Sequence, residues 1–224
     1  AILSGDAMFV DAVKLVMQVP DQCIRPVLEL FNKTALEVCE GQQYDMDFQS
    51  MNDVSIDAYL HMIRLKTAVL LGGALGIGAL VANADKEAVM SIYDFGVNLG
   101  VAFQLQDDIL DVYADAAKFG KRVGGDIVSN KKTFLLLTAL QDASGSNREE
   151  LLKWLRLDAG SGVDEEKVEA VKAIYDRLSV REKAEKKMQE LYQTAFRHLD
   201  EIPQPAEHKA PLRRIAEELM TREN

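Results

Sequence analysis

The sequence is poor in the residues that cross-link a chain or interrupt its helices. It has 5 prolines and 2 cysteines among 224 residues, and 48% of the residues are hydrophobic. Cys23 and Cys39 form no CxxC pair, which indicates reduced thiols in a cytosolic chain. The low proline and high hydrophobic content exclude a disordered chain and predict a single domain, residues 1–224, with a sizeable core.

Basic residues are also fewer than acidic ones. Acidic residues outnumber lysine and arginine by 36 to 26, which gives a net charge of −10 at pH 7. This field opposes a nucleic-acid partner, whose phosphates basic side chains would have to neutralise. A polyanionic substrate stays compatible with it if metal ions bridge the contact. The apolar start of the sequence has no basic n-region or cleavage motif, so we expect no signal peptide and a cytoplasmic protein.

Strict alternation of apolar and polar residues is absent over any length that would indicate a sheet, and nearly every segment has helical periodicity. We therefore predict an all-α fold. Ser55 and Asp85 are expected to be helix N-caps. The charged helices after about residue 147 are expected to be peripheral. Helices are predicted at residues 6–19, 23–40, 55–65, 67–83, 85–114, 130–142, 147–157, 164–201 and 206–221.

Residues 67–84 carry no charge for 18 residues and contain a Gly72-xxx-Gly76 spacing. This length reaches the lower limit for a membrane span, so a span and a buried helix are both open. We favour the buried helix, because glycine and alanine make the segment less hydrophobic than a leucine-rich span and no basic flank fixes a topology. We therefore do not expect an integral membrane protein.

The most informative pattern is the DDxxD cluster of Asp107, Asp108 and Asp111, which lies in an otherwise apolar stretch with helical spacing. A helix advances about 100° per residue, so Asp107 and Asp111 share one stripe with Phe103 and Gln104 and interrupt the buried face. Like charges one turn apart are costly to bury unless a cation neutralises them. Mg²⁺ suits this arrangement because it binds one or two carboxylates together with waters and phosphates. The motif predicts a magnesium site; a solvated acidic helix face is the alternative.

A glycine-rich, cationic segment follows this helix. It runs from Gly120 and Lys121 to Asp126, and Lys131 comes shortly after it. Glycine lets the backbone approach a ligand closely, and a lysine ammonium acts on phosphate as a point charge. Carboxylates followed by lysines therefore favour the metal interpretation and predict a site for a phosphorylated ligand.

Five sequence elements, in matching order and spacing, resemble the trans-isoprenyl diphosphate synthases, or polyprenyl synthetases. The resemblance covers most of the chain up to about residue 140 and loosely the rest. The elements are residues 1–7 (AILSGDA), 39–45 (CEGQQYD), 59–67 (YLHMIRLKT), 103–111 (FQLQDDILD) and 120–131 (GKRVGGDIVSNK).

The resemblance implies an isoprenoid synthase-type helical bundle around a central cavity. The implied enzyme is a prenyltransferase that condenses isopentenyl diphosphate with an allylic diphosphate (dimethylallyl, geranyl or farnesyl) to give an all-trans prenyl diphosphate. Ionisation assisted by Mg²⁺ would give an allylic cation, which the isopentenyl double bond attacks before a proton is lost. By matching position, Asp107, Asp108 and Asp111 would be Mg²⁺ ligands, with Asp107 the foremost.

Matching positions also imply the substrate contacts. The residues that would contact the allylic diphosphate are Lys66, Lys121 and Lys131. Those that would line the cavity beside the reacting carbon are Thr67, Gln104, Gln42 and Asp45, and Phe103 would pack near isopentenyl diphosphate. The expected catalytic set is Lys66, Thr67, Gln104, Asp107 and Lys121.

The sequence departs from the family pattern at its start. Family members carry a first aspartate-rich motif with two basic residues upstream of the element that here occupies residues 1–7, so we expect the sequence to be part of a longer protein. A noncatalytic subunit and a class I terpene cyclase are the alternative functions. The intact aspartates and lysines argue against a degenerate subunit, and the Lys66-Thr67 and Gly120-Lys121 pairs favour a condensing enzyme over a cyclase.

Small residues recur on the two most apolar segments. Gly96 and Gly100 are four residues apart, and Gly72, Gly76 and Ala79 are similarly spaced, so these helices can pack at a short interaxial distance. Together with the resemblance, this predicts a C2 homodimer whose interface exceeds ~1,000 Å². The alternative is that the glycines serve only packing within one chain.

Overall fold

The computed structural model describes residues 2–114, 123–157, 159–160 and 162–221, and this part of the chain contains helices and no strand. The all-α prediction is therefore confirmed. The elements are α1 (Ile2–Val16), η1 (Asp21–Cys23), α2 (Ile24–Ser50), α3 (Ile56–Ile63), η2 (Arg64–Ala68), α4 (Val69–Val81), α5 (Lys86–Tyr113), α7 (Gly125–Val128), α8 (Phe134–Asp142), α9 (Gly145–Leu155), α10 (Asp164–Arg177), α11 (Val180–Glu201) and α12 (Ala206–Met220).

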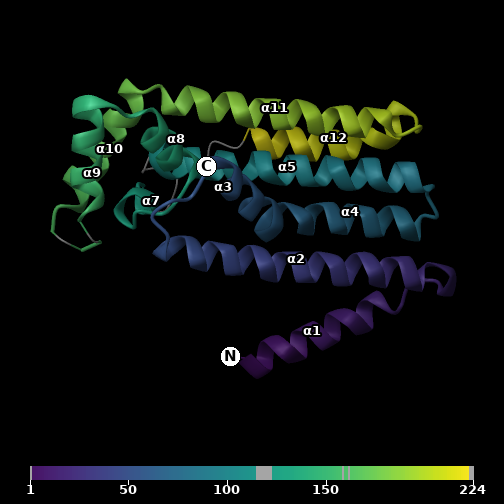
Figure 1. Ribbon diagram of the computed structural model, residues 1–224. Helices are drawn as coiled ribbons and strands as arrows, with labels where there is room; N and C mark the ends of the chain where they lie inside the picture. Colours follow the sequence, from purple (N-terminus) through teal and green to yellow (C-terminus); the bar gives the residue numbers. More distant parts are fainter. Residues whose placement is uncertain (1, 115–122, 158, 161, 222–224) are drawn as a thin grey trace.

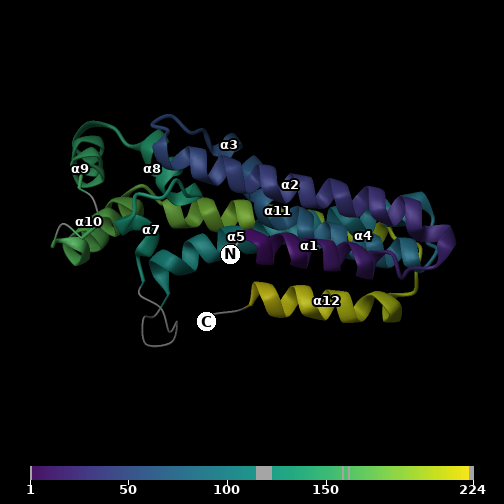
Figure 2. The same cartoon turned by 90° about the horizontal axis from the view of Figure 1, so that it is seen from below.

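The long helices α2, α4, α5 and α11 lie side by side, and α7 to α10 gather around one end of them (Figures 1 and 2). Helix α1 packs on the outer side of α2, and α12 packs beside α5 and α11 (Figure 1). Helix α5 is the centre of the packing, because apolar residues around most of its circumference are buried. Its C-terminal end meets the cluster of short helices, and the aspartates lie there.

Helix α11 is a correction to the sequence prediction. We expected the charged C-terminal helices to be peripheral, but α11 packs along the length of α5. Its polar residues face solvent while Val180, Ala184, Ala195 and Leu199 are buried in one stripe. One apolar stripe is therefore sufficient to place a highly charged helix against the core.

The glycines of α4 and α5 bring these two helices together. A Cβ on Gly96 would lie 2.8 Å from the Gly72 Cα, and a Cβ on Gly100 would lie 2.7 Å from the Ala68 Cα. Both distances are too short for a carbon contact, so only glycine fits at these positions. The prediction of close helix packing is confirmed, and the contacts lie within one chain. These glycines therefore do not by themselves support the predicted dimer.

Both predicted N-caps are confirmed. The side chain of Ser55 accepts a hydrogen bond from the Ala58 amide at 3.1 Å, and that of Asp85 accepts one from the Ala88 amide at 2.8 Å. Capping depends on residues within one turn, which is why sequence alone located both helix starts.

Several predicted boundaries are wrong. Helix α1 spans Ile2–Val16 instead of residues 6–19. Helix α2 continues to Ser50 instead of ending at residue 40, because Gly41 is buried against a neighbouring helix and does not end α2. Helix α8 starts at Phe134 rather than residue 130, with Thr133 as its N-cap. The predicted helix 164–201 is interrupted at Ser179, whose φ of 51° is left-handed.

Two helical runs, Ile56–Val81 and Lys86–Tyr113, are long and apolar enough to cross a membrane by length and composition alone. They correspond to α3, η2 and α4 in one run and α5 in the other, which pack on each other. The core helices of soluble proteins pass the same test.

Candidate functional site

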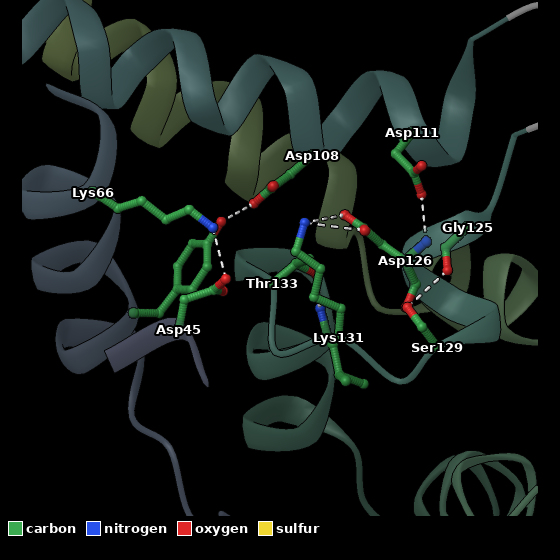
Figure 3. A network of polar contacts seen from close by, with 11 residues as sticks. Asp45, Lys66, Asp108, Asp111, Gly125, Asp126, Ser129, Lys131 and Thr133 are labelled. Atoms are coloured by element: carbon green, nitrogen blue, oxygen red, sulfur yellow. Dashed lines mark hydrogen bonds and ion pairs between the residues drawn. The ribbon is translucent and has the colours of Figure 1, made fainter. Parts of the chain in front are cut away.

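The candidate site lies where the C-terminal half of α5 faces η2, the last turns of α2 and the segment from α7 to Thr133. Figure 3 shows Asp108 and Asp111 projecting from α5, with Lys66 extending from the left and Lys131 from below, between Asp108 and Asp126. Residues from four separate parts of the sequence therefore supply alternating positive and negative charges to one region.

Lys66 and Asp45 form the first charge pair. The Lys66 ammonium donates to the Asp45 carboxylate at 2.6 Å, and about a third of the lysine side chain is exposed. The neighbouring Thr67 hydroxyl donates to Gln104 Oε1 at 3.3 Å. Lys66 and Thr67 belong to η2, a π-helical turn inside the run from α3 to α4. This turn thus presents consecutive polar side chains to α2 and to α5.

Asp108 is the most buried carboxylate of the site, with 2% of its surface exposed. It accepts a short hydrogen bond from the hydroxyl of Tyr59, which is also buried. Burial raises the pKa of Asp108 to about 7, and the hydrogen bond from Tyr59 opposes this rise. The same burial, followed by the charge of Asp108, raises the pKa of Tyr59 well above its ordinary value. Tyr59 therefore remains a proton donor to Asp108 across the physiological range.

Asp111 anchors the loop that returns to the site. Its carboxylate accepts a hydrogen bond from the Asp126 amide at 2.9 Å, and its carbonyl accepts one from the Gly124 amide at 2.6 Å. Gly124 has a φ of 84°, which favours glycine at this turn. Burial raises the pKa of Asp111, although the hydrogen bond from the Asp126 amide lowers it. The DDxxD helix thereby fixes the start of α7.

Lys131 forms the second charge pair. Its ammonium contacts both carboxylate oxygens of Asp126, at 3.1 and 3.2 Å. Burial alone would lower the pKa of Lys131, but Asp126, Asp108 and Asp45 together raise it. A cavity of about 760 Å³ opens beside Asp45 and Lys131, with Phe48, Met62 and other residues in its wall. The site therefore combines fixed cations and desolvated carboxylates, and Asp45 and Lys131 border the cavity beside it.

The remaining predicted residues have different surroundings. Gln42 is exposed on α2, one turn before Asp45, and Phe103 is half-buried next to Gln104. Lys121 lies outside the described residues. The predicted stripe needs a correction: Asp107 and Asp111 are half-buried, whereas Asp108 points into the core. The reason is that Tyr59 of α3 donates to Asp108 and the Phe134 amide at the start of α8 also hydrogen-bonds to it, so tertiary neighbours enclose this carboxylate.

The described residues contain no group of three or more His, Cys, Asp or Glu side chains that could by themselves hold a metal ion. Mg²⁺ does not need such a cage, because waters and ligand phosphates complete its octahedral shell. Burial is the main cause of the raised pKa values of Asp108 and Asp111, so a cation beside them would favour their charged forms. This donor chemistry fits Mg²⁺ that binds together with a polyanionic ligand.

Two residues of the site received no role from sequence reasoning. Tyr59 precedes Lys66 by seven residues, which is two helical turns, and this spacing could have placed both on one face. Asp126 directly follows Gly124 and Gly125, where a turn into a short helix could have been recognised. The available signal was thus a helical spacing for Tyr59 and a pair of glycines for Asp126.

Comparisons with known proteins identify the family of the chain. The family model for polyprenyl synthetases matches residues 1–178. A short chain isoprenyl diphosphate synthase from Methanothermobacter thermautotrophicus is 33% identical over 225 residues, which cover 100% of this chain and 67% of that protein. A crystal structure of a geranylgeranyl pyrophosphate synthase superimposes with a TM-score of 0.92 at 39% identity, over 100% of this chain and 68% of that one.

A third relative was solved with ligands. The geranylgeranyl pyrophosphate synthase from Corynebacterium glutamicum, complexed with isoprenyl diphosphate and magnesium, has a TM-score of 0.86 and 27% identity, over 99% of this chain and 62% of that one. The chain thus spans about two thirds of the length of these relatives.

Proposed function

The chain belongs to the polyprenyl synthetase family, and from this premise we propose that the native protein is a trans-prenyltransferase. It condenses isopentenyl diphosphate with an allylic diphosphate (dimethylallyl, geranyl or farnesyl) to give an all-trans prenyl diphosphate. The observation that carries this proposal is the position of Lys66 and Lys131 around the desolvated Asp108. Cations of this kind, next to carboxylates able to share a metal with phosphate, suit the departure of a diphosphate.

In this proposal, each side chain acts on charge or orientation. Lys66 holds the allylic diphosphate and stabilises the negative charge that develops as the allylic C–O bond breaks. Lys131 also contributes, and Lys121 is proposed as a further phosphate contact. Thr67 and Gln104, which hydrogen-bond each other, orient the substrate beside the reacting carbon. The isopentenyl double bond then attacks the allylic cation, and the released diphosphate accepts the proton whose loss restores the alkene.

Mg²⁺ is the proposed cofactor, and Asp107, Asp108 and Asp111 are its proposed ligands. When bound, Mg²⁺ neutralises diphosphate charge and so favours departure of this group. The magnesium in the Corynebacterium glutamicum structure supports this choice. The protein's own contribution is to keep Asp108 oriented through Tyr59 and Asp111 oriented through the Asp126 amide. Gln42 and Asp45 are proposed to line the cavity, and Phe103 to pack near isopentenyl diphosphate.

A cytoplasmic homodimer that does not insert into membranes or bind nucleic acid completes the proposal. None of the residues of α1 that the structure describes is buried, and Ile2, Leu3, Met8 and Leu15 are the most exposed large apolar side chains of the described residues. A second copy of the protein or the rest of a longer chain would cover such a surface, so it is compatible with a dimer and does not by itself support one. Sedimentation of the native protein at micromolar concentration tests the dimer, since a monomer would reject it.

The activity is tested with labelled isopentenyl diphosphate and each allylic diphosphate, with Mg²⁺ or with EDTA. We expect a labelled prenyl diphosphate that requires both substrates and the metal. Release of a hydrocarbon from an allylic diphosphate alone would instead indicate a cyclase. Activity that arises only after a second subunit is added would indicate a noncatalytic subunit.

A further inference from the structure

The turn that carries Lys66 and Thr67 has an uncommon backbone. In η2 the Val69 amide donates to the Arg64 carbonyl, which is the i to i+5 bond of a π-helix. One extra residue is thereby inserted into the run from α3 to α4, and each later side chain is rotated by about 100° relative to an uninterrupted helix. From this turn, the Lys66 ammonium contacts Asp45 on α2 and the Thr67 hydroxyl contacts Gln104 on α5.

Helix α2 approaches this turn at Gly41. A Cβ built on Gly41 would lie 2.2 Å from the Lys66 amide nitrogen, 2.6 Å from the Lys66 Cα and 2.7 Å from the Leu65 carbonyl carbon. All three atoms belong to the backbone of η2, so no rotation of a side chain can relieve the contact. The other close glycines between α2 and α4 differ, because a Cβ on Gly73 or Gly76 would first meet a side chain.

Gly41 and Asp45 are four residues apart on α2 and therefore share one face. The same helix thus contacts the backbone of Lys66 through Gly41 and its ammonium through Asp45. An added methyl group would push η2 away from α2 by about 1 Å before the contact became an ordinary one. The displacement would act directly on the side chains of Lys66 and Thr67.

We propose that Gly41 is a positioning residue for the prenyl transfer site. Because Gly41 has no side chain, α2 packs closely against the π-turn and holds Lys66 and Thr67 where they contact the allylic diphosphate. This inference rests on the proposed function and adds a residue that touches neither substrate nor metal. A misplacement of about 1 Å at a reacting group lowers rates by about a hundredfold, which sets the scale of the expected effect.

The test compares Gly41→Ala with two matched variants of the native protein. Gly96→Ala introduces a methyl group at 2.8 Å from the backbone of Gly72, between α4 and α5, and controls for a packing clash. Gly78→Ala adds a methyl group within α4 where no atom lies within 4 Å, and controls for helix propensity. Steady-state kinetics for both substrates and calorimetric titration with inorganic diphosphate and Mg²⁺ are measured on all variants.

We expect Gly41→Ala to raise KM for the allylic substrate at least tenfold and to lower kcat about a hundredfold, with KM for isopentenyl diphosphate changed less than threefold. Affinity for inorganic diphosphate should fall in parallel. Gly96→Ala should lower Tm without changing the ratio of the two KM values. Equal KM ratios in Gly41→Ala and Gly96→Ala would overturn the proposal, whereas absence of condensation by the native protein would overturn the proposed function instead.

A double-mutant cycle identifies the residue through which Gly41 acts. If the effect passes through Lys66, Gly41→Ala should change diphosphate affinity less than threefold in a Lys66→Ala background, and equal losses in both backgrounds would contradict this route. Should Gly41→Ala fail to fold, Leu65→Ala opens space behind the turn, since Leu65 is buried. The same kinetic comparison is then made between the Gly41→Ala/Leu65→Ala double variant and Leu65→Ala alone. A changed ratio of the two KM values supports the proposal, and an unchanged ratio overturns it.

Discussion

Burial of Asp108 predicts that the metal-free protein loses stability as pH rises from 5 to 8. The folded-state pKa of Asp108 is raised from 3.8 to about 7, chiefly by burial. The folded protein therefore keeps a proton that the unfolded chain releases near pH 4. The stabilising contribution of this proton is complete below the unfolded pKa and is lost as pH rises through the folded one.

The magnitude follows from the size of the pKa change. Each pKa unit corresponds to 1.36 kcal/mol, so a rise from 3.8 to about 7 has a total effect of about 4 kcal/mol. Between pH 5 and pH 8, about 3 kcal/mol of this is lost. Such a loss is a large part of the 5–15 kcal/mol typical of a folded domain, and it lowers Tm by about 6–12 °C for a chain of this size.

The assay is urea unfolding at pH 5, 6, 7 and 8 in EDTA, with the native protein and the Asp108→Asn variant. Asparagine has nearly the shape of the protonated acid and cannot titrate, so the variant removes this one contribution and leaves the other carboxylates unchanged. We expect the free energy of unfolding of the native protein, minus that of the variant, to fall by about 3 kcal/mol from pH 5 to pH 8. A difference that is constant across this range would refute the reasoning.

Three further predictions concern single side chains. Tyr59→Phe leaves the charged Asp108 without its buried donor and should cost about 1–3 kcal/mol of stability at pH 8, measured by urea unfolding; no loss would show that another group replaces the donor. Asp107→Ala should lower kcat by at least about a hundredfold, since metal-borne charge stabilisation is lost, and activity within about threefold of wild type would reject Asp107 as a ligand. Lys66→Ala should weaken binding of the allylic substrate more than that of isopentenyl diphosphate in separate titrations, and equal losses would contradict the assignment of Lys66 to the allylic diphosphate.

Local features of the fold could be predicted from the sequence, because their causes lie within a few residues. Ser55 and Asp85 cap their helices through hydrogen bonds three residues away. Features that depend on packing could not. Gly41 has a low intrinsic helix propensity, yet it lies inside α2 because the neighbouring π-turn needs a residue without a side chain at this position. The helix break at Ser179 likewise could not be predicted, because no glycine or proline occurs there.

The site shows the same division. Motif spacing indicated the lysines and aspartates that meet around α5, because these residues occur in the same order as in the motifs of the family that the sequence resembles. It did not indicate how deeply each one is buried. Helical phase placed Asp107 and Asp111 on the inner face, but Tyr59 from α3 closes over Asp108 instead. Tertiary neighbours decide which carboxylate is desolvated, and one helix considered alone contains no information about them.

The charge pairs of the site explain how an acidic protein can accept a polyanion. Lys66 and Lys131 each pair with an aspartate, Asp45 and Asp126, whose side chains are only 18% and 20% exposed. These pairs keep both ammonium groups in place before substrate arrives, so binding does not have to order them. A diphosphate competes with the two aspartates for the same ammonium hydrogens, and the carboxylates released in this exchange need a new counter-charge. A divalent cation carried with the diphosphate supplies it. We therefore infer that substrate and metal bind more tightly together than separately, despite the net charge of −10.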